Sequence, residues 1–298
     1  MAGYAFVALA ASAWGTWPLF LREAEAAGPL HPAIESAFAM TVMTLASAPF
    51  CLWDRVRARP RPSQWLGVVW LGFSDAMNVF LFFRAYQTTT VAIAVMTHYL
   101  APLFVAMAAP LVLRERLTRR TLGAVGLSFV GLALLLSPRA VAPTHTEGIG
   151  AALGAASAAF YASNVIVNKR ITPVFSGSEL VFYHGVVAAP VLLLLVPRGG
   201  ASGLSGHTVL VLLAGSFVAG AMGGLMFVWG LRRIEATRAS GLTFLEPLVA
   251  VISAWAFLHE GLTLGKALGG VLILTGAALV VTGGPGQRIT VDSTRAAD

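Results

Sequence analysis

Ten apolar stretches, each long enough to cross a lipid bilayer, dominate this sequence of 298 residues. A membrane-spanning helix needs about 20 predominantly apolar residues. Such stretches lie at residues 3–22, 32–53, 64–86, 90–113, 119–137, 148–168, 177–197, 207–231, 236–258 and 264–283. They lack the short apolar–polar alternation of membrane-barrel strands. The sequence therefore predicts an all-α membrane protein with ten transmembrane helices.

The composition excludes the main alternatives to a membrane protein. The chain is 57% hydrophobic and 11% charged, whereas soluble domains average about 45–50% and 25%. Its one cysteine, Cys51, cannot form an internal disulfide. The net charge of +7 arises largely from basic residues between apolar stretches, where membrane topology explains them better than nucleic-acid binding does. No basic residue precedes the first apolar stretch, so we expect no cleavable signal peptide.

The distribution of Lys and Arg predicts the orientation in the membrane. With the N-terminus in the cytoplasm, 15 of the 20 basic residues fall on the cytoplasmic side. These are Arg55, Arg57, Arg59, Arg61, Arg114, Arg116, Arg119, Arg120, Lys169, Arg170, Arg232, Arg233, Arg238, Arg288 and Arg295. The other five are Arg22, Arg84, Arg139, Arg198 and Lys266. Because basic loops stay on the cytoplasmic side, both termini are expected there.

The chain contains two related halves. Residues 83–118 match residues 228–263 at an offset of 145. In this match Leu100-Ala101-Pro102-Leu103 aligns with Leu245-Glu246-Pro247-Leu248, and Glu115-Arg116-Leu117-Thr118 aligns with Glu260-Gly261-Leu262-Thr263. Trp14-Gly15-Thr16-Trp17 similarly matches Tyr161-Ala162-Ser163-Asn164. Since each half has five spans, an odd number, the second half must insert upside down. The sequence predicts two inverted five-helix repeats, a design found in many transporters.

These features resemble the drug/metabolite transporter superfamily, and specifically its ten-helix exporters with two EamA-type repeats. The resemblance rests on Pro102 and Pro247, on the Glu-x-Leu-Thr sequences, and on the glycines of the spans that follow, namely Gly123, Gly126, Gly131, Gly269, Gly270 and Gly276. It implies a first repeat at 1–143, a second at 144–284 and a cytoplasmic tail at 285–298. It also implies that spans one, three, four, six, eight and nine line a central cavity, which spans five and ten brace. Within the superfamily the chain is most similar to the bacterial amino-acid exporters of the cell inner membrane.

Polar residues near the middle of the spans are candidates for binding substrate. Asp75 and Glu246 carry charge at a depth where charge is costly, so they are functional candidates by default. Asn78, His98 and Tyr99 lie within about one helical turn of the same depth, and Phe244 is related to Tyr99 by the repeat. Glu35 and Glu179 lie near helix ends and are expected at the membrane interface.

Structural roles for the same residues remain open. Glu246 precedes Pro247, whose ring leaves a helix carbonyl without its usual partner, and a protonated Glu246 could donate to that carbonyl. Asp75 and Asn78 could form a polar clasp between helices. His98 could be a packing histidine. Thr118 and Thr263 are expected to be N-caps of spans five and ten.

Aromatic and proline residues suggest moving parts. Trp14 and Trp17 lie outward of the centre of span one, while Tyr161 and Asn164 lie inward of the centre of span six. The two groups are candidate gates on opposite sides of the cavity, although aromatic packing explains them equally well. Pro102 and Pro247 are candidate hinges.

The substrate prediction follows from the charges that the spans contain and lack. No Lys or Arg lies near the middle of a span, which disfavours phosphate-bearing substrates. No His, Cys, Asp or Glu pair has metal-ligand spacing, and no cofactor motif is present. We therefore predict a transporter of small zwitterionic or neutral molecules, chiefly an amino-acid exporter. A multidrug or quaternary-cation exporter is the alternative, and a membrane-embedded enzyme lacks the HExxH or GxSxG motif that would support it.

Overall fold

The computed structural model describes residues 1–26, 28–53, 60–115, 117–136, 145–259 and 261–282. This part of the chain is helical and contains ten candidate membrane spans: Ala2–Ala24, Pro32–Trp53, Pro62–Thr88, Val91–Val112, Arg119–Leu136, His145–Ile171, Gly177–Leu195, Gly206–Leu231, Ala236–Leu258 and Leu264–Thr282. Each lies within about three residues of the stretch predicted from the sequence. The ten-helix prediction is confirmed. The proposed tail at 285–298 and residues Arg55, Arg57, Arg59, Arg116, Arg139, Arg288 and Arg295 lie outside the described residues.

Six of the spans are single helices. These are α3 (Pro32–Trp53), α4 (Pro62–Thr88), α7 (Arg119–Leu136), α8 (His145–Ile171), α9 (Gly177–Leu195) and α14 (Leu264–Thr282). Thr118 and Thr263 cap two of them: the Thr118 hydroxyl accepts the Thr121 amide at 3.1 Å, and that of Thr263 accepts the Lys266 amide at 3.3 Å. The predicted N-caps of spans five and ten are therefore confirmed.

The other four spans are interrupted near mid-length. Their segments are α1 (Ala2–Gly15) with α2 (Trp17–Ala24), α5 (Val91–His98) with α6 (Ala101–Val112), α10 (Gly206–Gly215) with the π-helix η1 (Ser216–Gly223) and α11 (Gly224–Leu231), and α12 (Ala236–Leu242) with α13 (Leu245–Leu258). Pro102 and Pro247 lie in the first turn of α6 and α13, where the missing N–H has no intrahelical partner to lose. The prolines therefore begin half-helices and do not kink continuous ones.

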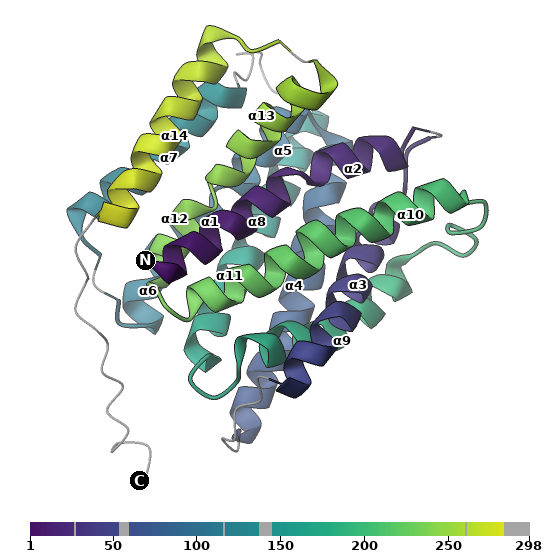
Figure 1. Ribbon diagram of the computed structural model, residues 1–298, viewed down its shortest axis with the longest axis horizontal. Helices are drawn as coiled ribbons and strands as arrows, with labels where there is room; N and C mark the ends of the chain where they lie inside the picture. The colour runs from purple at the N-terminus through teal and green to yellow at the C-terminus, as the bar shows by residue number, and fades with distance from the viewer. Residues whose placement is uncertain (27, 54–59, 116, 137–144, 260, 283–298) are drawn as a thin grey trace.

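The packing of the helices agrees with a two-fold relation between the halves. Helix α4 of the first half packs on α8 of the second half. Its counterpart in the second half, α11, packs on α1 of the first half. The pairs α3–α9 and α7–α14, which such a relation would map onto themselves, are also in contact (Figure 1). Arg114 and His259, 145 residues apart, are the described non-glycine residues with positive φ, at 56° and 55°. The same turn thus follows spans four and nine.

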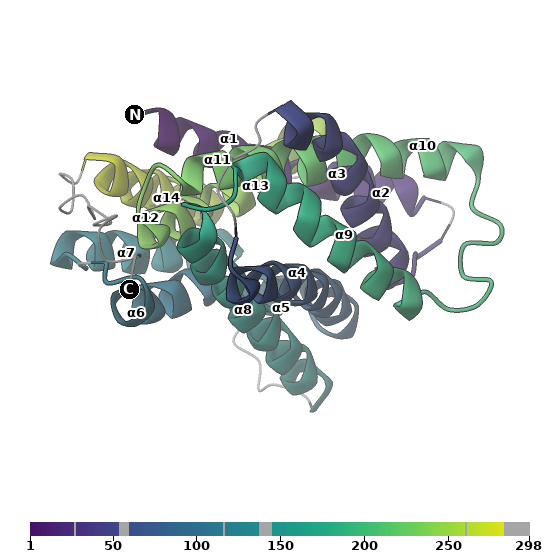
Figure 2. The same ribbon diagram turned by 90° about the horizontal axis from the view of Figure 1, so that it is seen from below.

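The surface and interior of the bundle suit a bilayer. Large apolar side chains are strongly exposed on the outer faces of the helices, for example Leu111, Leu194 and Phe257, as expected where lipid replaces water. Inside, small residues allow close contact. A Cβ on Gly72 of α4 would lie 2.5 Å from the His184 carbonyl oxygen, and one on Gly15 would lie 2.5 Å from that of Glu246. Figure 2 shows the same bundle from below.

Candidate functional site

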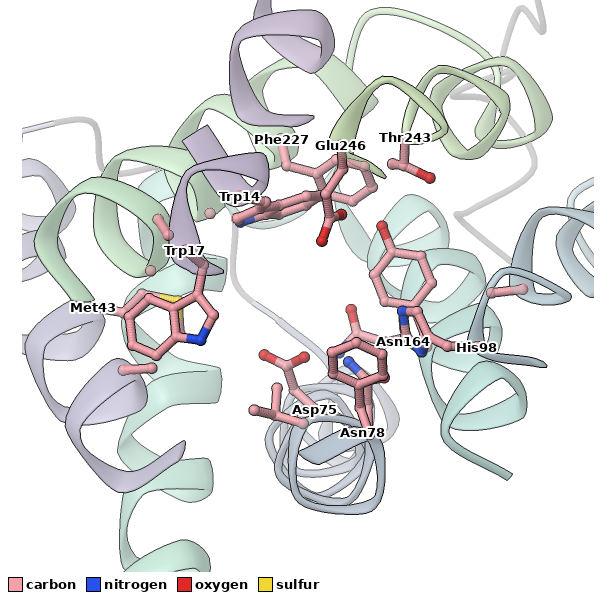
Figure 3. Close-up of a pocket in the computed structure, with 18 of the residues that line it drawn as sticks. Trp14, Trp17, Met43, Asp75, Asn78, His98, Asn164, Phe227, Thr243 and Glu246 are labelled. Carbon is pink, nitrogen blue, oxygen red and sulfur yellow. The ribbon is translucent and has the colours of Figure 1, made fainter. Parts of the chain in front are cut away.

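A cavity of about 200 Å³ lies among the interrupted spans. Its walls come from α1 to α6, α8, α9, η1, α11, and the junction of α12 with α13. Neither α7 nor α14 contributes a lining residue. The described residues place a small cavity, apolar over most of its lining, at the interface of the two halves (Figure 3).

Two carboxyl groups face this cavity from opposite walls. Glu246 lies in the first turn of α13, where the helix dipole favours a negative charge. Asp75 lies at the middle of α4. Figure 3 shows the two carboxyl groups pointing toward each other across the open space. Since no Lys or Arg is among the described lining residues, the cavity favours a ligand with a positively charged group.

His184 of α9 pairs with Asp75. The ring atom Nε2 lies 3.1 Å from Oδ2 of Asp75, although it is not aligned with that oxygen as a well-formed hydrogen bond would be. The other ring nitrogen, Nδ1, lies 2.8 Å from the Leu180 carbonyl oxygen. Gly72 makes the contact possible, because a larger residue there would separate α4 from α9.

A second polar network joins α4, α5 and α8. The Ser157 hydroxyl lies 2.9 Å from both the backbone oxygen and the Oδ1 of Asn78 and donates its one hydrogen to them. Nδ1 of His98, 2.9 Å away, must therefore donate to Ser157. In neutral His98 this leaves Nε2 as an acceptor. Asn164 also ties α8 to α4, donating to the Leu71 carbonyl oxygen at 3.1 Å.

Tyr99, between α5 and α6, connects this interrupted span to the one formed by α12 and α13. Its hydroxyl lies 3.4 Å from the Thr243 carbonyl oxygen. In a continuous helix this oxygen would accept a hydrogen bond from the backbone amide of residue 247, but Pro247 has no amide hydrogen. The Glu246 side chain does not fill this role, because it points into the cavity (Figure 3), whereas the Glu246 backbone amide donates to the Thr243 carbonyl oxygen at 2.9 Å.

Aromatic side chains form the remaining walls. Trp17 lies beside Phe83, with ring centroids 6.3 Å apart, and its indole N–H is buried with no hydrogen-bond partner among the described residues. Trp14 and Tyr161 both contact Phe227, at centroid distances of 5.2 and 6.3 Å. Trp14 and Tyr161, which were predicted to lie on opposite sides of the cavity, therefore share Phe227 as a neighbour.

The structure brings together ten of the twelve residues predicted for the site. Asp75, Asn78, His98, Tyr99, Glu246, Trp14, Trp17, Tyr161, Asn164 and Pro102 line the cavity. Phe244 and Pro247 do not. Phe244 is buried behind Tyr99, with ring centroids 5.4 Å apart, and does not line this cavity. The gating and hinge roles remain predictions.

Sequence reasoning missed several lining residues. His184 lies near the middle of its span, and the depth criterion that selected His98 would also have found it. Phe227, Thr243 and Asn168 carry no comparable signal. Glu35 and Glu179, expected at the interface, are only 2% and 4% exposed because the protein itself covers them. No three His, Cys, Asp or Glu side chains of the described residues are grouped as metal ligands.

A polar cluster closes the bundle at the end where α1 begins. Glu115, between α6 and α7, accepts the Ala236 amide at 2.7 Å and the Thr237 amide at 3.3 Å, and so caps α12. Lys169 donates to the Leu231 and Ile234 carbonyl oxygens at 2.7 Å each. Burial raises the pKa of the Glu115 carboxyl above its usual value, and the two amides partly oppose that rise.

Ten candidate membrane spans in the described part of the chain, grouped around a cavity that two carboxyl groups face, indicate a multi-pass membrane protein of the transporter type. The family model of the EamA-like transporter family matches the chain twice, at residues 1–137 and 148–282. This protein belongs to the EamA-like transporter family. The two matches correspond to the two halves found in the sequence.

Individual relatives support this assignment. A transporter of Archaeoglobus fulgidus is 30% identical over 235 residues, covering 79% of this chain and 81% of the relative. Protein PecM of Dickeya dadantii is 31% identical over 68% of each chain. A Salmonella typhimurium protein named "Probable amino-acid metabolite efflux pump" is 31% identical over 58% of this chain and 61% of its own. A solved crystal structure with a TM-score of 0.79 covers 94% of this chain and 96% of its own at 20% identity, which shows a shared fold.

Proposed function

We propose that this protein exports amino acids or closely related zwitterions by alternating access around the central cavity. The observation that carries the proposal is the arrangement of Asp75 and Glu246 on opposite walls of the cavity (Figure 3). An ammonium group would bind to the carboxylates. The relative from Salmonella named for amino-acid metabolites adds support.

The size of the cavity separates this proposal from its alternative. Pockets for drug-sized ligands occupy about 300–1,000 Å³, whereas this cavity measures about 200 Å³. A quaternary ammonium ion would use the aromatic walls but has no N–H to donate to Asp75 or Glu246. Multidrug or quaternary-cation export is therefore the second candidate.

Counterflow in proteoliposomes tests the proposal. Liposomes loaded with one unlabelled amino acid are diluted into the same labelled amino acid, and the panel is repeated for the twenty common amino acids. We expect labelled substrate to accumulate transiently for a subset of them, and tetramethylammonium to compete weakly. Absence of counterflow for the whole panel, with accumulation of tetramethylammonium or ethidium, would favour the alternative.

The proposal includes residence in the inner membrane with both termini in the cytoplasm. Cys51 is replaced by Ser, and single cysteines are then placed at Arg61, Gly200, Arg232 and Gly261. We expect an impermeant maleimide applied outside intact cells to label positions 200 and 261, and to label 61 and 232 only after lysis. Labelling of 61 and 200 from the same side would contradict the inverted repeats.

A further inference from the structure

The two sides of the cavity differ in chemistry. His98 and Asn164 lie on one side of the two facing carboxyl groups, and both already have partners within the protein (Figure 3). His98 bonds to Ser157 at 2.9 Å, and Asn164 donates to a backbone oxygen at 3.1 Å. Trp17 and Met43 lie on the other side of the carboxyl groups (Figure 3). That side presents an aromatic ring and a thioether, so it suits an apolar part of a ligand.

Two glycines of the neighbouring span determine the position of Met43. Helix α3, which carries Met43, packs against the π-helix η1. A Cβ on Gly220 would lie 3.1 Å from the Ala39 carbonyl oxygen, and one on Gly224 would lie 3.1 Å from Sδ of Met43. The thioether therefore occupies the space beside Gly224 that a side chain there would fill. Met43 is only 4% exposed but lines the cavity, so its size contributes to the size of this apolar side.

The repeat shows that this side of the cavity carries a small residue where the other half carries an acid. At the offset of 145, Gly220 aligns with Asp75, and Ala101 aligns with Glu246. All four residues line the cavity. Gly220 also lies within η1, and π-helical turns occur frequently at functional sites. The cavity thus has two acids in unrelated positions of the repeat, and room beside α3 where a third carboxyl group could otherwise have stood.

We propose that Met43 sets the size limit of an apolar pocket, between Met43, Trp17 and Gly220, that binds the side chain of the substrate. With the substrate ammonium between Asp75 and Glu246, its side chain reaches this apolar side. Methionine suits the role, because its rotatable bonds and polarizable sulfur let it adapt to different chains. The substrates are then amino acids with aliphatic or thioether side chains, since an aromatic ring needs more room than Met43 leaves. The pocket deepens the proposed function and rests on it.

Binding of n-alkylammonium ions, from ethyl to hexyl, tests the pocket without any amino acid. Protein in lipid nanodiscs is titrated in a calorimeter, with empty nanodiscs as the blank. We expect affinity to rise about fourfold for each added methylene until the pocket is full. Met43→Ala should move this limit to longer chains. Gly224→Ala should move it to shorter ones, because the added methyl group displaces the sulfur of Met43.

Matched substitutions outside the cavity are the controls. Met222→Ala lies on η1 at a position that is 40% exposed and does not line the cavity, and Gly123→Ala lies on α7 where a Cβ meets nothing within 4 Å. Both should keep the parental limit. If Met43→Ala does not fold, Met43→Val should give a smaller shift in the same direction. The same limit in the parent, the Met43 variant and Gly224→Ala would overturn the proposal, as would the absence of binding by every chain length.

Counterflow of L-norleucine and L-phenylalanine tests the pocket in transport. We expect the parent to prefer norleucine, and the ratio of phenylalanine to norleucine to rise at least about fivefold in Met43→Ala. Met222→Ala should keep the parental ratio. An unchanged ratio in Met43→Ala would overturn the role of Met43 and leave amino-acid export in place. Alkylammonium binding with the expected shifts, but without counterflow of any amino acid, would support the pocket and overturn the proposed function.

Discussion

The two interrupted spans that contain Pro102 and Pro247, α5–α6 and α12–α13, are related by the repeat but differ in how they are completed. In α5–α6, Thr90 caps its own helix by accepting the Ile93 amide, and Ala101 begins the second segment. In α12–α13, the position equivalent to Ala101 is Glu246, and the cap comes from Glu115 in the other half. The cap of α5 thus comes from its own span, whereas the cap of α12 comes from Glu115 in the first half. The α12–α13 span also places the Glu246 carboxyl group in the cavity.

The largest expected effect comes from removing the charge that distinguishes the second break. Glu246→Gln keeps the size of the side chain but loses its charge, so an ammonium would no longer have its partner on α13. We expect amino-acid counterflow to fall at least about tenfold, equivalent to about 1.4 kcal/mol. The assay is counterflow at matched amounts of reconstituted protein.

Leu127→Ala and Leu272→Ala, on α7 and α14, are the controls for Glu246→Gln, because neither residue lines the cavity. Both should transport at close to the parental rate. Parental transport by Glu246→Gln would mean that the difference between the two breaks has no role in binding.

A second test concerns the contact that positions α13. A Cβ at Gly15 would lie 2.5 Å from the Glu246 carbonyl oxygen and 2.7 Å from Cβ of Val249, so Gly15→Ala must push α1 and α13 apart. The counterpart of Gly15 in the second half is Ala162. We expect a loss of about 1–3 kcal/mol in stability, measured as a lower melting temperature in detergent. Gly123→Ala on α7, where a Cβ meets nothing within 4 Å, should not lower it.

A third test compares the two caps. Glu115→Ala leaves the buried Ala236 and Thr237 amides without their acceptor, at an expected cost of about 1–3 kcal/mol. Thr90→Ala removes one cap bond on an exposed turn and should cost about 0.5–2 kcal/mol. Thermal unfolding of both variants measures the difference, and a larger loss for Thr90→Ala would contradict the dependence of α12 on the other half.

The Glu115 cap should also depend on pH. Because burial raises the pKa of this carboxyl in the folded protein, its contribution to stability is fully present below the unfolded pKa. It is lost as the pH rises through the raised value. Glu115→Gln, which does not titrate, should flatten this part of the pH profile of the melting temperature. An unchanged profile would assign the dependence to other groups.

The smallest effect is expected from the two prolines. Each lies in the first turn of a half-helix, so Pro102→Ala and Pro247→Ala should change stability little. Pro247→Ala restores an N–H that competes with Tyr99 for the Thr243 carbonyl oxygen and should slow transport more than Pro102→Ala does. Parental rates in both variants would mean that the breaks do not depend on proline.

The sequence by itself determined the features that depend on residues close together in the chain. The ten spans follow from runs of apolar residues, because a bilayer accepts only segments whose backbone groups bond internally. The caps at Thr118 and Thr263 follow from local turn chemistry. Depth along each span selected five polar residues that line the cavity, namely Asp75, Asn78, His98, Tyr99 and Glu246, since 1.5 Å per residue converts position into height.

Only the tertiary structure decided which of these residues meet. Depth does not specify the direction in which a side chain points, so Phe244 was placed in the cavity although it packs behind Tyr99. The contact of Asp75 with His184 depends on how closely Gly72 lets α9 approach α4, and the cap that Glu115 gives α12 joins residues 121 apart. Such contacts are set by the packing of whole helices from both halves, because rotation of a helix about its axis is fixed only by its neighbours.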